Sequence, residues 1–262
     1  MPSPLVKPLI TSTYPADGPR VQMPERMAKV TPDLKRALYG IRDELQAQGG
    51  KLELSDLFRS YDMQFQAHLD YASGKKPAFS PPPGSSMHES GRAFDIDLSR
   101  IKVSLAAFWE IAKRWGVVPI IAEPKTSISE SWHFECRGSH QLVRDHYQAG
   151  KGTNFKPAAA LAVSAILGSG VPHDRFKGKA DAAYLQSGLI RLGHDIGNID
   201  GDIGPKTLGV LSSLGIVSAS ASASASASAS RAEQVAGLDG LLQKKFPEEF
   251  FDKTIDEISP FV

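Results

Sequence analysis

Two short segments of the sequence hold residue types that can do chemistry together. The segment from Ser86 to Asp95 contains His88 and ends in a carboxylate, and Glu130-Ser-Trp-His133 pairs a glutamate with a second histidine. Two imidazoles and one carboxylate can supply the three ligands of a catalytic zinc ion, whose open fourth position holds the reactive water. A further carboxylate beside that water can accept its proton. The two segments together predict a metal-dependent hydrolase.

The spacing within both segments resembles the zinc D-Ala-D-Ala metallopeptidases. This family includes D,D-carboxypeptidases, vancomycin-resistance dipeptidases and phage L-alanyl-D-glutamate endopeptidases. The resemblance covers residues 31–137 and implies that His88, Asp95 and His133 bind Zn²⁺ and that Glu130 is the catalytic base. The matching positions are Ser86-x-His88-x-x-Gly91-x-Ala93-x-Asp95 and Glu130-x-Trp132-His133.

An arginine upstream of these segments is a further candidate. In the resembling family a strand ends in an Arg-Ser pair followed by a glutamine, and Arg59, Ser60 and Gln64 fit this pattern. A guanidinium group can bind a peptide carbonyl, a substrate carboxylate or a developing oxyanion. We therefore predict a catalytic and substrate-binding role for Arg59, with a surface ion pair as the alternative. Ser86 is a second candidate for contact with the substrate backbone.

The residues around the first segment indicate how its ligands are positioned. Ala93–Leu98 alternates polar and apolar residues, which is typical of a strand with Asp95 and Asp97 on the same face. Gly91 is suited to a tight turn that folds His88 back toward this strand. Asp97 is either a carboxylate that orients a metal ligand or a solvated residue at the strand end, and the pattern leaves both open.

The second segment also predicts a strand, Ser131–Cys136. Its period of two puts His133 and Glu135 on one face and Cys136 on the other. Glu135 is therefore a candidate to orient His133 by hydrogen bonding from outside the metal centre. Cys136 points away from His133, so we expect a small buried hydrophobic side chain and not a zinc ligand.

The remaining patterns of residues 31–150 predict an α+β fold, with helices packed on one side of a small antiparallel sheet. Thr31 is expected to cap the first helix and Pro32 to begin it. The proline-rich stretch before Gly84 is expected to be either one wall of the substrate cleft or a plain connector. The resemblance implies a D-Ala-D-Ala metallopeptidase or Hedgehog-like fold. Further helices are predicted over 62–71, 103–115 and 141–148, and further strands over 51–57 and 117–121.

A second, helical unit is predicted downstream. The segment Asp200-Gly201-Asp-Ile-Gly-Pro-Lys-Thr207 resembles a turn of the helical peptidoglycan-binding repeat, in which Thr207 could cap the next helix. The sequence departs from the repeat after Thr207, so a purely structural role is the alternative. We expect an extended arm at 1–30, a zinc peptidase domain at 31–150, a linker at 151–179 and a helical peptidoglycan-binding-like domain at 180–262. A strict Ser-Ala alternation at 218–230 interrupts this domain and predicts a flexible insertion.

Composition limits the partners. A net charge of +1 gives no field to attract nucleic acid, and no apolar run is long enough to cross a membrane. A single cysteine excludes an internal disulfide. No secretory signal peptide is recognised at the N-terminus, so action on the cell wall requires another route, such as phage-type release. We expect a monomer acting on peptidoglycan stem peptides. The alternatives are a non-catalytic relative that binds the wall or a protein, and a zinc peptidase for non-wall peptides.

Overall fold

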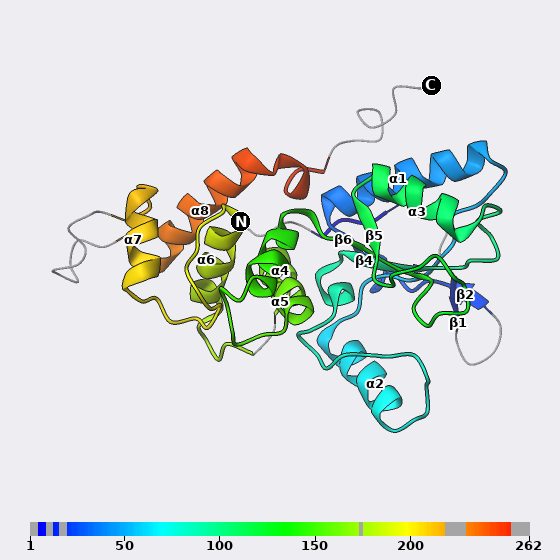
Figure 1. Ribbon diagram of the computed structural model, residues 1–262, viewed down its shortest axis with the longest axis horizontal. Coiled ribbons are helices and arrows are strands. Elements are labelled where there is room, and N and C mark those ends of the chain that lie inside the picture. The colour runs from blue at the N-terminus through cyan, green and yellow to red at the C-terminus, as the bar shows by residue number, and fades with distance from the viewer. Residues whose placement is uncertain (1–4, 9–12, 16–19, 173–174, 218–228, 253–262) are drawn as a thin grey trace. The chain divides into compact units, whose positions relative to one another are not determined.

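The computed structural model describes residues 5–8, 13–15, 20–172, 175–217 and 229–252, which form two compact units. The sheet unit comprises the described residues up to 138 together with 248–252, and the helical unit comprises the described residues from 139 to 247. The predicted α+β class, with a small antiparallel sheet and a separate helical unit, is confirmed (Figure 1). Most of the Ser-Ala segment, 218–228, and the tail from 253 lie outside the described residues.

Four antiparallel strands form the sheet that carries the candidate site. They are β3 (Leu54–Asp56), β4 (Ala93–Ile96), β5 (Val117–Pro119) and β6 (His133–Cys136), in the order β3-β4-β6-β5. Each lies within a segment that the sequence predicted as a strand. The observed strands are shorter than the predicted ones, because alternation continues in the sequence beyond the residues that find a pairing partner.

The hydrophobic core lies on the face of the sheet opposite to the candidate site. Helices α1 (Pro32–Ala47) and α3 (Leu105–Arg114) pack together and contact β6 and β5 respectively (Figure 1). On the sheet, Phe94 stacks on Phe134, and Phe108 of α3 meets Phe134 edge-on with ring centroids 4.8 Å apart. All three side chains are fully buried, so β4 and β6 are fixed on the face behind the site.

The N-terminal arm is more structured than the sequence predicted. Its described residues include a short antiparallel pair, β1 (Thr13–Pro15) and β2 (Arg20–Gln22), and a bridge in which Val6 and Val30 exchange both backbone hydrogen bonds. Met23 and Met27 are buried in the core of the sheet unit. Strands of three residues are too short to show an alternation, which explains why the pattern did not reveal them.

The first helix begins as predicted, but the predicted capping role of the Thr31 side chain is not borne out. Thr31 does occupy the N-cap position and Pro32 begins α1, but the Thr31 side chain accepts no capping hydrogen bond. Its hydroxyl oxygen is buried and finds no hydrogen-bond partner in the residues that the structure describes. The backbone N–H of Thr31 donates instead to the carbonyl of Gly91, so this end of the helix is tied to the turn beside the candidate site.

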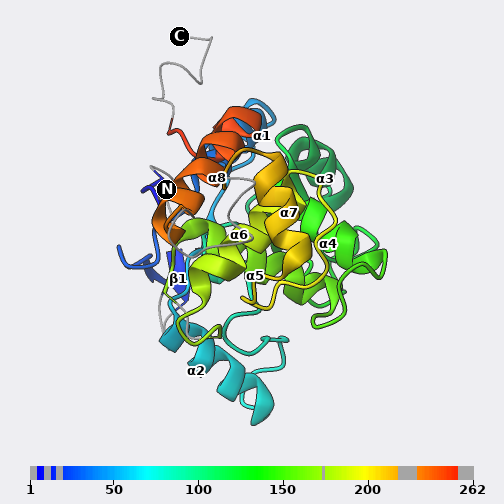
Figure 2. The same cartoon turned by 90° about the vertical axis from the view of Figure 1, so that its left-hand side faces the viewer.

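The helical unit contains five α-helices among its described residues: α4 (Gln141–Gln148), α5 (Pro157–Ser169), α6 (Ala180–Arg191), α7 (Pro205–Ser213) and α8 (Arg231–Lys245). α4, α5 and α6 pack against one another, and α8 packs against α6 (Figure 2). Helix α5 falls within residues 151–179, where the sequence predicted a linker. No helix in the described part of the chain is long and apolar enough to cross a bilayer.

The predicted turn between helices is present between α6 and α7. The side-chain amide of Gln186 accepts hydrogen bonds from the backbone N–H groups of Asp200 and Gly201, and donates to the Asp200 carboxylate and the Asp202 carbonyl. The predicted cap is wrong, however, because Gly204 is the N-cap of α7 and Thr207 lies buried inside the helix.

The chain returns to the sheet unit after α8, within the short helix η4 (Pro247–Glu249). Glu249 lies 3.3 Å from the guanidinium of Arg92, and both side chains are only 1% exposed. Arg92 also donates to Asp33 of α1 at 2.6 Å, and Lys35 binds Asp252 at 2.8 Å. The sheet unit is therefore completed by residues more than a hundred positions downstream of its last strand.

Candidate metal centre

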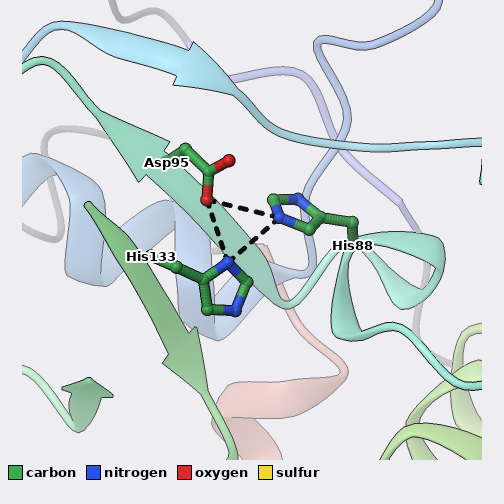
Figure 3. Close-up of side chains that lie close together, drawn as sticks. All are labelled: His88, Asp95 and His133. Atoms are coloured by element: carbon green, nitrogen blue, oxygen red, sulfur yellow. Dashed lines mark hydrogen bonds and ion pairs between the residues drawn. The ribbon is translucent and has the colours of Figure 1, made fainter. Parts of the chain in front are cut away.

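The three predicted ligands converge at one point (Figure 3). Asp95 Oδ1 lies 2.9 Å from His133 Nδ1 and 3.4 Å from His88 Nε2, and the two histidine nitrogens are 3.2 Å apart. All three side chains are buried. Among the described residues, no other group of three His, Cys, Asp or Glu side chains offers ligand atoms this close together.

Strand register brings two of these ligands together. Asp95 on β4 and His133 on β6 are direct partners in the antiparallel ladder, so their side chains leave the same face of the sheet. The third predicted ligand, His88, belongs to the short helix η1 (Met87–Ser90), which is capped by Gly91. Gly91 has a φ of 69°, in the left-handed region that favours glycine, as the predicted tight turn requires.

The protonation of His88 follows from its hydrogen bonds. Its Nδ1 lies 2.6 Å from the carbonyl oxygen of Leu57, which can only accept, so Nδ1 carries the proton. The Nε2 lone pair is then directed toward Asp95 and His133. A backbone carbonyl that fixes the tautomer of a metal-binding histidine is the usual arrangement around a metal site.

The predicted residue Glu135 lies beside the outer nitrogen of His133. The Nε2 of His133 lies 3.7 Å from the Glu135 carboxylate, which in turn accepts a hydrogen bond from Arg137 at 2.6 Å. Burial alone would lower the pKa of His133, but the carboxylates of Asp95 and Glu135 outweigh it and raise that pKa to about 10. Without another cation, His133 would therefore hold a proton between two carboxylates.

The geometry of the centre fits a bound cation. Two nitrogens that can offer lone pairs and one carboxylate oxygen, all buried, lie within 3.4 Å of one another. Burying a carboxylate among such groups costs free energy unless a positive charge lies between them. Burial would raise the pKa of Asp95, yet the two histidines lower it below its usual range. Two His and one Asp are a donor set that zinc accepts, so the residues present fit this ion.

Glu130 has the properties expected of a base. It precedes β6 in a turn and has a φ of 68°, which is unfavourable for a residue with a side chain. One oxygen of its carboxylate is buried and has no hydrogen-bond partner among the described residues. Burial raises the pKa of Glu130; the charge on His133 opposes this rise and the Asp95 carboxylate reinforces it. The charges of His133 and Asp95 thus act on Glu130, as expected of a base close to the candidate metal centre.

Arg59 follows β3 and lies next to the centre. Its Nε and Nη2 donate to the Asp56 carboxylate at 2.8 and 2.5 Å, and Nη2 is 3.8 Å from Asp95 Oδ2. Its Nη1 donates to Gln64 at 3.2 Å. The alternative prediction for Arg59 was a surface ion pair. Arg59 does form an ion pair, with Asp56, but both side chains are largely buried and the pair lies next to the candidate site.

The other predicted site residues, Ser86 and Asp97, form hydrogen bonds with residues close to them in the sequence. Ser86 is buried at the start of η1, where its backbone N–H donates to the Glu89 carboxylate. Asp97 accepts hydrogen bonds from the N–H and hydroxyl of Ser99 at the turn after β4. Cys136 faces away from His133 toward Asp33, as the alternation of β6 predicted.

Sequence reasoning assigned no role to Asp56 or Glu89. Asp56 fixes the guanidinium of Arg59, and Glu89 binds the backbone N–H groups of Gly84 and Ser86 in the loop that leads to His88. The spacing of Asp56 and Arg59 on one strand end was a usable signal. Glu89 follows Ser86 at the spacing of a helix-capping box, which could also have been recognised.

No protein-family model and no curated protein matches the sequence. Among solved structures, the LD-carboxypeptidase LdcB, described in terms of peptidoglycan recognition, is 21% identical over 51% of this chain and 68% of its own, with a TM-score of 0.41. DacB from Streptococcus pneumoniae D39 is 21% identical over 56% of this chain and 91% of its own, with a TM-score of 0.35. An L,D-carboxypeptidase DacB of the pneumococcus is 20% identical over 51% and 84%, with a TM-score of 0.32. At these TM-scores, the assignment of the site rests on the residues of this chain.

Proposed function

We propose that this protein is a zinc-dependent peptidase that hydrolyses peptide bonds in the stem peptides of bacterial peptidoglycan. The observation that supports this most is the convergence of His88, Asp95 and His133, together with Glu130, one oxygen of which is buried and unpartnered within the described part of the chain. A binding protein has no need for a base at that position. The choice of peptidoglycan as substrate comes from the motif resemblance in both units.

The chemistry divides between the ion and the side chains. Bound by the three ligands, zinc supplies a Lewis acid that acidifies water and polarises a carbonyl. Glu130 removes a proton from the attacking water and delivers it to the leaving amine nitrogen. Its raised pKa suits both transfers, since a base with a pKa nearer neutrality can also act as the acid.

Arg59 has the position and charge to assist. Its guanidinium is held by Asp56, and its Nη2 lies 3.8 Å from Asp95, so a positive charge stays at the edge of the centre. We assign to it the stabilisation of negative charge on the carbonyl oxygen in the transition state, or the binding of a nearby substrate carboxylate. Ser86 remains a proposed contact for the substrate backbone.

For the helical unit we propose attachment to the wall. The resemblance of the Asp200-Gly201 turn to a peptidoglycan-binding repeat motivates this, and Gln186 holds that turn in place. A tethered module raises the local concentration of substrate without changing the catalytic groups. Binding of the purified protein to insoluble peptidoglycan, measured with the Glu130→Gln variant so that the wall is not digested, tests this role.

The proposed reaction is tested by digesting purified peptidoglycan and analysing the released products by mass spectrometry. A peptidase releases or shortens stem peptides, and the mass difference identifies the bond. Loss of a terminal residue indicates a carboxypeptidase, and release of whole stem peptides indicates an endopeptidase. Intact stem peptides after incubation with zinc-loaded protein would contradict the proposal.

A further inference from the structure

Helix α2 (Tyr61–Ala72) is attached to the sheet unit in an unusual way. The residues that it buries are polar, Gln64 and Asp70, whereas Phe65 and Leu69 are 46% and 43% exposed. An amphipathic helix normally buries its apolar face. Met63 is partly buried against the core, but the exposed Phe65 and Leu69 do not account for the complete burial of Gln64.

The contacts of Gln64 explain its burial. Its Oε1 accepts a hydrogen bond from Arg59 Nη1 at 3.2 Å, and its Nε2 donates to the Ser80 hydroxyl at 2.9 Å and to the Pro81 carbonyl at 2.7 Å. The Pro81 carbonyl can only accept, which fixes the orientation of the amide. The three hydrogen bonds of the Gln64 side chain thus join Arg59 to the loop after α2.

That loop is held at both ends. On the α2 side, His68 Nδ1 lies 2.8 Å from the carbonyl oxygen of Ser80. On the other side, the Glu89 carboxylate accepts from the N–H of Gly84 at 2.9 Å, four residues before His88. Between these anchors lie three consecutive prolines, 81–83, whose φ angles are fixed by their rings. The loop is therefore stiff, and Gln64 links it to the guanidinium group.

We propose that Gln64 is a positioning residue that holds the Arg59 guanidinium and the Ser80–Pro83 loop in one fixed relation. This inference rests on the proposed function, in which Arg59 stabilises charge in the transition state. Asp56 accepts hydrogen bonds from one edge of the guanidinium. Gln64 accepts one from Nη1 and so fixes the remaining side of the group. Since the loop anchors Gln64 in turn, the direction in which Arg59 presents its charge depends on the loop.

A double-mutant cycle distinguishes positioning from a general structural role. Gln64→Met removes the amide at similar volume and should lower kcat roughly tenfold, since small displacements of a catalytic group are costly. KM should change less than kcat, and the zinc content should stay unchanged. In the Arg59→Ala background the same substitution should change kcat less than about twofold, because its effect acts through Arg59. Gln66→Met, the same change at an exposed position of α2, is the matched control.

A spectroscopic measurement makes the test independent of activity. In protein labelled with ¹⁵N-arginine, the Nη resonances of Arg59 should show hindered rotation in the parent and the Gln66→Met variant, and faster rotation in Gln64→Met. Equal losses of kcat in both backgrounds, or unchanged Arg59 resonances in Gln64→Met, would overturn the inference. If the parent protein hydrolyses no wall peptide, the proposed function fails while the resonances still decide the positioning of Arg59.

Discussion

Asp95 and His133 face each other directly across the β4–β6 ladder, with Asp95 Oδ1 2.9 Å from His133 Nδ1. This relationship depends on strand register. A slip of one residue would place Phe134 opposite Asp95 and turn His133 toward the core. The stack of Phe94 on Phe134 opposes such a slip, because the two rings fill the core on the other face. The core therefore sets the geometry of the metal centre.

The three-ligand centre predicts stoichiometric zinc. Metal analysis of the purified protein should find about one zinc ion per chain, the usual content of a mononuclear catalytic site. His88→Ala and His133→Ala should each remove the metal, whereas His194→Ala, in the helical unit, should retain it. Full zinc occupancy in both ligand variants would show that the ligands are wrongly assigned.

The turn between His88 and Asp95 should not tolerate a side chain. A Cβ at Gly91 would lie 2.7 Å from a Leu5 methyl group, and the φ of 69° is unfavourable for alanine. We expect Gly91→Ala to lower the free energy of unfolding by about 2 kcal/mol, given roughly 1–2 kcal/mol for the left-handed conformation plus the clash. It should also weaken zinc binding, because it displaces His88.

Gly74→Ala is the matched control for this substitution. Gly74 has a φ of 74° but nothing within 4 Å of an added Cβ, so only the conformational cost applies. Urea denaturation measures both variants, and a zinc titration with a chelating dye measures metal affinity. Equal destabilisation, with zinc affinity unchanged in Gly91→Ala, would contradict the role of this turn.

The buried ion pair between Arg92 and Glu249 should stabilise the sheet unit. Glu249→Ala leaves the guanidinium with Asp33 as its remaining described carboxylate partner, so we expect a loss of roughly 3 kcal/mol, in the range for breaking a buried pair. The same argument predicts that a chain ending near Gly150 is destabilised in its sheet unit. Thermal unfolding checks this, with Glu248→Ala as the control, and equal melting temperatures for both variants would count against it.

Cys136 should be unreactive in the folded protein. Burial raises the pKa of its thiol well above the ordinary value, and the nearby Asp33 carboxylate adds to the rise. As the pH rises, the thiol therefore loses its proton at a lower pH in the unfolded chain than in the folded protein. The contribution of the buried thiol to the free energy of unfolding is complete below about pH 8.5 and is lost as the pH rises further. Alkylation of native protein at pH 8 should be slow and should follow unfolding. Rapid labelling without denaturant would show that Cys136 is accessible.

The sequence was sufficient for the features that depend on local spacing. The period of two on 93–98 predicted the strand that carries Asp95, although this strand ends before Asp97. The same period on 131–136 predicted that Glu135 lies with His133 and Cys136 opposite. The expected turn at Gly91 was also correct. These succeed because side-chain direction in a strand follows from residue number alone.

Features that depend on distant partners could not be predicted in this way. The return of Glu249 to Arg92 joins residues far apart in the chain, and no local pattern marks it. The hydroxyl of Thr31 fails to cap α1, although the sequence fits a cap, because its surroundings are set by tertiary packing. The carbonyl of Leu57 that fixes His88 carries no side-chain signal at all.

The most direct test of the proposed peptidase compares Glu130→Gln with the parent protein on purified wall peptides, with zinc content measured in the same samples. Glutamine keeps the size of the side chain but cannot accept the proton, so turnover should fall by roughly two or more orders of magnitude. Zinc should stay at one ion per chain, since Glu130 is not among the three ligands. Turnover near the parent rate with zinc still bound would contradict the central claim that Glu130 is the base of a zinc peptidase.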